Sequence, residues 1–376
     1  MARYFLFPEK DATIYAHPDR VLQNTGRDEI LTITSEQSSD RADYFYPSRY
    51  LIQFKQDELL EATSLVTGNY SASLQIFTTE NKNLAASQTI EVLAVANNEG
   101  GSTQVLNWDN GTGRWLNTPP TQDGVSWKNI TPTTEWATSS FALGITGSYE
   151  SGSAGGGNWF SSPTLIQSQS FTLVDNLDLD VNVTSTVFRW QSSGVANSGF
   201  LLKRSGSDFT TTDQGELNYF SLETHTIFPP ALVISWDDST YSVDPSGSVY
   251  TGGESLFTEI YNNKAEYKRD EIAQFRVLVR ERYPERRFVT TSNYLNKGYF
   301  EEGTLTYSVR DAATELEIIP FDDNSTKVSA DTTSSFFNIY MQGLEPERYY
   351  KVILKHTSST GIVTIYDNDE VFKVIR

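Results

Sequence analysis

The stretch that most limits what this chain can fold into runs from Val181 to Lys203, VNVTSTVFRWQSSGVANSGFLLK. Between Val181 and Trp190, β-branched and aromatic residues recur at alternate positions, with one shift in register, as they do in a pleated strand. A second apolar run, Phe200 to Leu202, follows QSSGVANSG, whose small and polar residues favour a chain reversal. Both runs are of the composition that favours sheets. We therefore predict two strands joined by a turn in a β-sheet core.

The length of 376 residues is large for one compact domain, so two or three domains are expected. Short β-rich runs alternate with turn clusters along the chain, at spacings typical of antiparallel sandwiches or barrels. One segment, DELLEATSL from Asp57, favours a short helix. With 38% apolar and 13% aromatic residues, the chain can bury a sizeable core. The predicted fold class is all-β.

The charge and the cysteine count exclude several classes of function. A formal net charge of −19 repels phosphate groups, so general nucleic-acid binding is not expected. The absence of cysteine excludes disulfides, thiolate metal sites and thiol nucleophiles. The start, MARYFLFPEKD, lacks the apolar region of a signal peptide, and no apolar window reaches the roughly 18–20 residues of a membrane span. We expect a soluble protein made in a cytoplasm, without membrane insertion.

Residues 97–170 are rich in glycine, serine, threonine and asparagine, and they also contain five tryptophans. Because tryptophans are costly to leave in water, we expect long ordered loops laid over a sheet edge or a barrel mouth. Their indoles could stack on sugar rings, or they could form the core of the loops or a subunit interface, which is the preferred interpretation. These residues are Trp108, Trp115, Trp127, Trp136 and Trp159.

Five segments of the N-terminal part occur in an order that resembles the DNRLRE domain over residues 7–237, with 97–170 as an insertion. They are DATIYA, SRYLIQF, SLQIF, the stretch from Val181 to Lys203 described above, and SLETHTIFPPALVISW. The resemblance implies a jelly-roll β-sandwich, similar to carbohydrate-binding modules, of a kind found in secreted, cell-wall-associated and phage virion proteins. Leu222 departs from the pattern, because a basic residue is expected there. The first domain is placed at residues 1–237.

The turn-rich segment 238–254 is predicted to be a linker, and residues 255–376 a second domain. IAQFRVLVRERYP, from Ile272, alternates as a half-buried strand, with the face that begins at Ala273 inward. Six or seven such strands predict an immunoglobulin-like or fibronectin-like sandwich. MQGLEPERYYKVILK resembles the fibronectin-type pattern, in which a corner tyrosine bonds back to the backbone.

Residues 245–376 also resemble modules from virion structural proteins of marine tailed phages, most clearly over RERYPERRFVTTSNYLNKGYFEEGTLTYSVRD. This resemblance implies a protein of a phage particle. Within it lies the one basic cluster of an acidic chain, which is either a solvated strand face or a docking site for an acidic neighbour. The candidate docking residues are Arg280, Arg282, Arg286 and Arg287.

Residues that could carry chemistry are scattered. The three histidines have no metal-ligand spacing, and there is no GxSxG motif. The adjacent pairs Asp237-Asp238 and Asp322-Asp323 could act as acid and base or bind calcium, but solvated turns explain them equally. The best calcium candidate is the group in IYDNDEVF, which a hairpin turn also explains. We predict no catalytic residue, no cofactor and no metal.

The predicted function is that of a non-enzymatic structural protein of a tailed-phage virion, in the neck, collar or tail or associated with the capsid. It is made in the host cytoplasm and docks in many copies to other virion proteins and to itself. One alternative is a glycan-binding decoration or adhesion protein that touches host surface glycan through the Trp-rich loops. Another is a glycan-active enzyme, which needs a carboxylate pair within one cleft.

Overall fold

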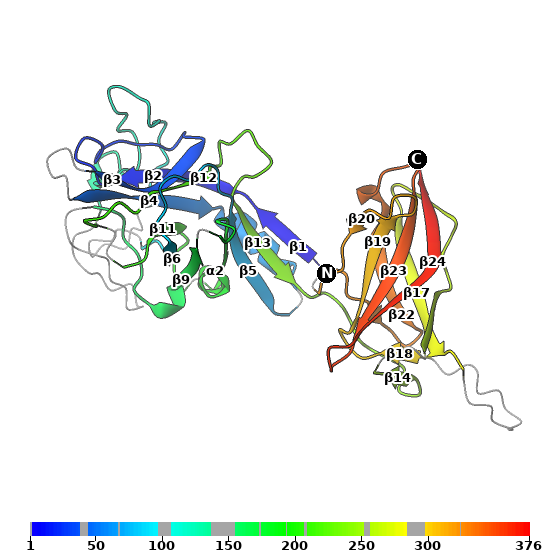
Figure 1. Cartoon of the computed structure of the whole chain (residues 1–376). Coiled ribbons are helices and arrows are strands. Elements are labelled where there is room, and N and C mark those ends of the chain that lie inside the picture. The colour runs from blue at the N-terminus through cyan, green and yellow to red at the C-terminus, as the bar shows by residue number, and fades with distance from the viewer. Residues whose placement is uncertain are drawn as a thin grey trace, which may run out of the picture. The chain divides into compact units, whose positions relative to one another are not determined.

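The structure is a computed structural model that describes residues 2–37, 44–66, 68–96, 107–136, 155–172, 174–192, 194–206, 209–251, 256–283, 298–323 and 325–376. The described chain divides into two compact units (Figure 1): an N-terminal unit, Tyr4–Ser235, and a C-terminal unit, Trp236–Arg376, to which Met1–Arg3 also belong. With 47% of residues in strands and 7% in helices, the predicted all-β class is confirmed.

The N-terminal unit is a jelly-roll-like sandwich whose described residues form two main sheets. In spatial order, the first sheet is β1 (Ala2–Leu6), β13 (Ala231–Trp236), β5 (Tyr70–Ile76) and β10 (Leu179–Asn182). The second is β12 (Glu216–Phe220), β3 (Ile30–Gln37), β4 (Phe45–Phe54), β11 (Phe200–Arg204), β6 (Ser87–Ala94) and β9 (Ile166–Thr172), with β2 (Pro8–Tyr15) also paired to β4. Every pairing in the second sheet is antiparallel.

Strand β4 shows why this unit has apolar layers on both sides of its larger sheet. Successive side chains of a strand point to opposite faces, yet Tyr50, Leu51 and Ile52 are all fully buried. Leu51 belongs to a buried cluster that joins Ile14 of β2 to tryptophans of the 107–136 segment. The Trp-rich segments therefore cover a sheet face, whereas we expected them at a sheet edge or barrel mouth. A short hairpin within this cover is formed by β7 (Asn129–Thr131) and β8 (Thr134–Glu135).

The prediction of a strand between Val181 and Trp190 is wrong over most of that stretch. Only β10 is a strand, and α2 (Thr184–Gln191) is a helix. Val183, Val187 and Trp190 are buried at helical spacing, whereas Phe188 is 57% exposed. The second predicted strand of that stretch is confirmed as β11.

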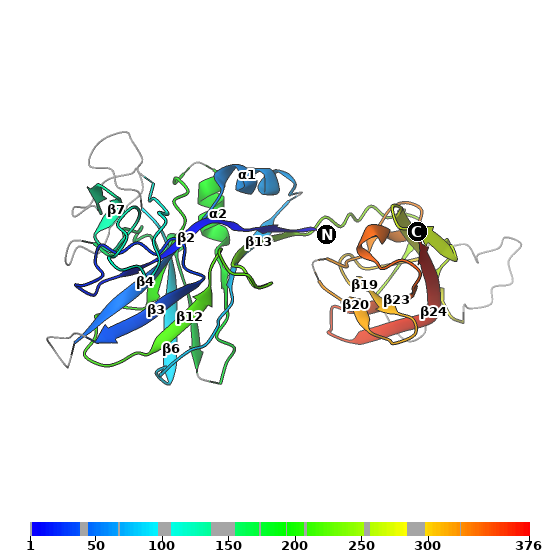
Figure 2. The same cartoon turned by 90° about the horizontal axis from the view of Figure 1, so that it is seen from above.

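The helix predicted from Asp57 is confirmed as α1 (Gln56–Ser64). It lies beside α2 at one edge of the unit (Figure 2), and the side chain of Gln56 donates to the carbonyl of Trp190 at 3.2 Å. A short 3₁₀ turn, η1 (Pro163–Leu165), precedes β9 and also contacts α2. Residues of α1, α2 and η1 line the groove described below.

The C-terminal unit is an immunoglobulin-like sandwich, again with two main sheets in its described residues. One contains β14 (Ser248–Tyr250), β18 (Gly298–Phe300), β17 (Ile272–Glu281), β22 (Ser335–Tyr340) and β21 (Ser329–Ala330), with β15 (Leu256–Ile260) on β17. The other contains β16 (Glu266–Lys268), β24 (Val363–Ile375), β23 (Tyr349–Thr357), β19 (Leu305–Asp311) and β20 (Glu317–Ile319). The split of β15, β17, β22 and β21 from β19, β23 and β24 is that of strands A, B, E, D and C, F, G in constant-type domains.

Two predictions about this unit are confirmed in detail. Strand β17 alternates as expected, with Phe275 and Val277 fully buried and Ile272 59% exposed. The corner tyrosine is Tyr350, whose hydroxyl donates to the carbonyl of Glu345 at 2.9 Å. This bond fixes the entry to β23 after the 3₁₀ turn η2 (Met341–Gly343).

Much of the segment predicted as a linker, 238–254, is built into the C-terminal unit. Tyr241 pairs in parallel with Ala330, and β14 pairs in parallel with β18. Just before it, Asp237 forms an ion pair with Lys327 at 2.6 Å. Neither of the described helices is long and apolar enough to cross a lipid bilayer.

Candidate functional site

Four of the five tryptophans singled out in the sequence are buried in the N-terminal unit, with 1–8% of their surface exposed: Trp108, Trp127, Trp136 and Trp159. The indole N–H of Trp108 donates to the carbonyl of Ser198 at 2.9 Å, and that of Trp136 to the carbonyl of Ser126 at 3.0 Å. Their rings pack against the larger sheet, so a sugar could reach them only if the loops opened.

The fifth, Trp115, is half-buried in a packed cluster. The guanidinium carbon of Arg20 lies 3.0 Å from the centroid of its indole ring, and the ring of Tyr15 lies 4.5 Å away. Its backbone N–H donates to both carboxylate oxygens of Asp28 at 3.0 Å. Burial of Asp28 raises the pKa of its carboxyl group to about 6. A cation thus already occupies a face of Trp115.

The predicted docking arginines belong to the C-terminal unit, separate from the tryptophans. The guanidinium carbon of Arg280 lies 4.6 Å from the ring centroid of Phe257, and Arg282 is exposed. Arg286 and Arg287 lie outside the described residues. The part of the cluster that is described therefore presents cations at the end of β17.

Several other charged groups of the C-terminal unit are already paired. Arg276 and Asp331 form a two-pronged pair at 3.2 and 2.9 Å, which lowers the pKa of the aspartate to about 2. The ammonium group of Lys351 lies 2.9 Å from Glu315 and 3.0 Å from Asp367, within the IYDNDEVF segment. Among the described residues, no cluster of three His, Cys, Asp or Glu side chains could hold a metal ion.

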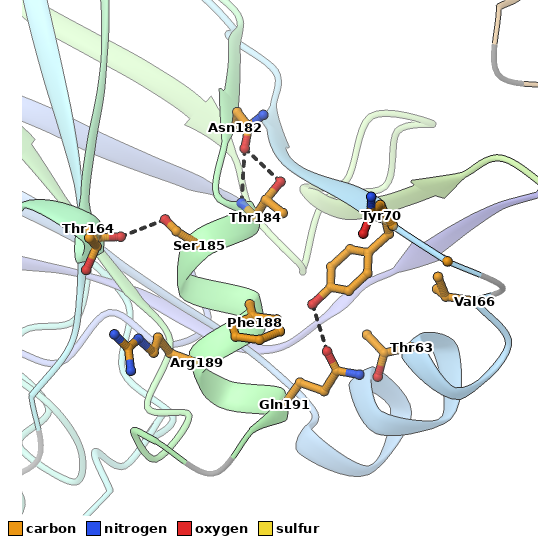
Figure 3. Close-up of a pocket in the computed structure, with 12 residues that line it drawn as sticks. Thr63, Val66, Tyr70, Thr164, Asn182, Thr184, Ser185, Phe188, Arg189 and Gln191 are labelled. Atoms are coloured by element: carbon orange, nitrogen blue, oxygen red, sulfur yellow. Dashed lines mark hydrogen bonds between the residues drawn. The ribbon is translucent and has the colours of Figure 1, made fainter.

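A groove of about 900 Å³ lies on the N-terminal unit, where α1, β5, β10, η1 and α2 meet. It opens to solvent, and its lining combines aromatic, hydroxyl and amide side chains (Figure 3). We call it the α2 groove, after the helix that forms its central wall. Its most prominent lining residues are Tyr70, Asn182, Ser185, Phe188, Arg189 and Gln191.

Hydrogen bonds hold the start of α2 against its neighbours. The side-chain oxygen of Asn182 accepts bonds from the backbone N–H of Thr184 at 3.1 Å and from its hydroxyl at 2.8 Å. The Thr184 hydroxyl oxygen accepts the N–H of Ala72 in β5 at 2.8 Å. The hydroxyl of Ser185 donates to the carbonyl of Thr164 in η1 at 2.6 Å. These bonds fix the helix to both neighbouring elements, so the groove wall is preformed.

The two sides of α2 have opposite character. Its inner side is buried, with the ring of Trp190 4.7 Å from that of Phe200 in β11. Its outer side presents Phe188, which stands at the centre of the groove between Arg189 and Tyr70 (Figure 3). A phenylalanine that is 57% exposed between polar side chains offers a free ring face to a ligand.

The electrostatics of the α2 groove differ from those of the chain as a whole. Of its twelve lining residues, none is acidic and only Arg189 carries a charge, although the chain has a net charge of −19. Within the described chain, the Arg189 guanidinium forms no hydrogen bond or ion pair. The hydroxyl of Tyr70 donates to the side-chain oxygen of Gln191 at 3.0 Å, which leaves the amide N–H groups of Gln191 free as donors. The groove can therefore stack on a ring, donate hydrogen bonds and bind an anion.

A buried carboxyl pair lies elsewhere in the same unit. Asp11 is fully buried, and its Oδ2 accepts the backbone N–H of Leu222 at 2.7 Å. Oδ1 of Asp11 and Oε2 of Glu223 are both buried, and two ionised carboxylates have no donor to offer each other. Burial, followed by the neighbouring charge, raises the pKa of Asp11 well above its usual range, and burial also raises the pKa of Glu223. Both shifts favour the protonated form of the two carboxyl groups, and the guanidinium of Arg27 lies 3.2 Å from Oε1 of Glu223.

The α2 groove was missed because its central residues were assigned to a strand. In TSTVFRWQ, Val187 and Trp190 continue the helical spacing that begins at Val183, and this was the available signal. The other groove wall, around Tyr70, comes from a segment more than 100 positions away in the sequence. No local pattern connects the two walls.

Comparison with known proteins gives little further guidance. No family model and no curated protein matches the chain. One solved structure with a weak match is the adhesin domain of Epf from Streptococcus pyogenes, at 7% identity and a TM-score of 0.15, over 98% of both chains. A likeness of this size carries no argument about fold or function.

Proposed function

We propose that this chain is a non-enzymatic structural protein of a tailed-phage virion, in which a DNRLRE-like jelly roll is joined to an immunoglobulin-like assembly module. It docks in several copies to other virion proteins and to itself, in the neck, collar, tail or capsid-associated position. Support comes from the resemblance of residues 245–376 to phage virion modules and from one surface of the C-terminal unit.

The surface that carries this proposal is the outer face of β24. Strands whose outer face meets water normally carry polar side chains there. In β24, Val363 and Ile365 are 54% and 59% exposed, next to Ile362 at 65%, whereas Tyr366 points inward and is buried. Both faces of this half of the strand are therefore apolar, which is typical of a surface that another protein covers.

The same part of β24 also has an open edge. Val363–Tyr366 pair with β23 on one side, and among the described residues the other side of β24 is paired only at Lys373–Ile375, with β16. An open edge presents unpaired backbone N–H and carbonyl groups to a partner strand. An apolar face and an open edge at one place favour docking by strand addition or face packing.

The test is the double substitution Val363→Asp and Ile365→Asp in the full chain. We expect it to abolish incorporation into particles, or self-association of the purified protein, while the melting temperature changes little because both side chains are exposed. The matched control is Leu116→Asp, an exposed leucine of the N-terminal unit at 86% exposure. Normal assembly by the double variant would remove this surface from the proposal.

The α2 groove favours a second candidate function, glycan binding as a decoration or host-adhesion protein. An exposed aromatic ring among hydroxyl and amide groups suits a sugar, whose C–H faces stack and whose hydroxyls form hydrogen bonds. This moves the candidate contact from the five tryptophans to Phe188. Binding of the purified chain to a glycan array, lost in Phe188→Ala, would support this function, and no binding to any glycan would remove it.

A further inference from the structure

We propose that the α2 groove selects sugars that carry an anionic group, with Phe188 as the stacking platform and Arg189 as the ligand of the anion. The inference rests on the glycan-binding candidate above and adds the class of ligand and the residue that determines it. The anionic group is a carboxylate, sulfate or phosphate on a sugar ring, since all three offer the oxygen geometry that a guanidinium binds.

The first argument is the position of the ring. Phe188 is on the outer side of α2, and its neighbours Val187 and Trp190 are buried, so the helix cannot turn this ring inward without exposing its core side. Arg189 and Tyr70 lie on opposite sides of Phe188 (Figure 3). A sugar stacked on Phe188 therefore has a cation on one flank and a phenol with amide groups on the other.

The second argument is the charge of Arg189. The chain has 48 acidic residues against 29 lysines and arginines, so carboxylates that could pair with an exposed arginine are in excess. Arg189 has no such partner within the described residues, and the groove lining contains no acid that would compete with a ligand. A free guanidinium beside a free aromatic ring recognises a planar or tetrahedral anion by paired N–H donors.

The third argument is that the groove is preformed. The Asn182, Thr184 and Ser185 bonds fix the start of α2, and the packing of Trp190 on Phe200 fixes its end. The amide N–H groups of Asn182 and Gln191 have no partner within the described chain and remain available to sugar hydroxyls. A rigid site loses less conformational entropy when it binds.

The experiment measures binding of the full chain to immobilised oligosaccharides that share a backbone and differ in one substituent: neutral, carboxylated, sulfated or phosphorylated. We expect the anionic forms to bind about ten-fold more tightly than the neutral form, a typical gain for one charged contact. Arg189→Gln should remove that preference, so that the anionic forms bind no more tightly than the neutral form. Phe188→Ala should weaken both by about ten-fold or more.

Two control variants separate local from general effects. Lys82→Gln removes an exposed positive charge elsewhere on the same unit, and Phe7→Ala removes an aromatic ring that is 50% exposed. Both should bind as the unchanged chain does. The anionic probe that binds most tightly identifies whether the preferred group is a carboxylate, a sulfate or a phosphate.

Three results would overturn the inference, and each points to a different error. Equal binding of neutral and anionic probes, or an Arg189→Gln variant that keeps the preference, would refute the anionic selectivity while glycan binding stands. An equal loss in Lys82→Gln would show that net charge, and not Arg189, produces the preference. Absence of binding to every probe would instead refute the glycan-binding function itself.

Discussion

Asp11 carries a carboxyl group in a fully buried position, and burial raises the pKa of that group well above its usual range. Its Oδ2 accepts the N–H of Leu222, and the neighbouring carboxyl group of Glu223 also contributes to the raised pKa of Asp11. Asp11 begins the DATIYA segment, and Leu222 is the position where a basic residue is expected. Leu222 bonds to Asp11 through its backbone N–H, and this bond does not depend on the identity of the side chain. The sequence could not predict the pair, because 212 positions separate its members.

The raised pKa of Asp11 makes the N-terminal unit less stable as the pH rises. In the unfolded chain Asp11 ionises near pH 4, whereas in the folded chain its pKa is raised. The contribution of Asp11 to the free energy of unfolding is therefore fully present below about pH 4. It is lost as the pH climbs through the raised pKa, and Asp28, with a pKa of about 6, adds to the loss between about pH 4 and 6. Asp11→Asn should therefore raise the free energy of unfolding at pH 8 by about 1–3 kcal/mol.

Urea titrations followed by tryptophan fluorescence between pH 4 and 8 measure this effect, since six of the seven tryptophans lie in the N-terminal unit. The control is Glu61→Gln, an exposed carboxyl group on α1. If the free energy of unfolding of Asp11→Asn depended on pH as strongly as that of the unchanged chain, the raised pKa of Asp11 would not be the cause of the pH dependence.

Strand β17 and helix α2 show which elements the sequence could predict. In β17 the period of two runs over eight consecutive residues, so its buried face, Ala273 to Val279, could be predicted directly. In α2 the segment is only eight residues long and is rich in β-branched and aromatic residues, which favour strands. Its helical state depends on the bond from Ser185 to Thr164 in η1 and on the packing of Trp190 against Phe200 in β11, and both contacts are tertiary.

The buried face of β17 gives a second stability test. Val277→Asp places a charge without a partner in the core of the C-terminal unit and should cost more than about 3 kcal/mol. Ile272→Asp, on the opposite face of the same strand and 59% exposed, should change stability little. Scanning calorimetry should show one transition lowered by Val277→Asp. Equal melting of both variants would mean that the face assignment is wrong.

The whole chain joins two sandwiches, which differ in how their apolar sheet faces are covered. The N-terminal unit covers the second face of its larger sheet with its own Trp-rich segments, so four of the five candidate tryptophans are core residues. The C-terminal unit leaves apolar side chains of β24 exposed at an open edge. Composition predicts that tryptophans need cover, but only tertiary structure shows that the chain supplies it, and which strand remains uncovered.

Immunogold labelling of purified tailed-phage particles, with an antibody raised against this chain, tests the proposed role most directly. If the chain is a structural protein of the virion, gold should lie at one fixed position on each particle, in several copies. Particles that carry no label, while the free protein is abundant in the lysate, would contradict that role.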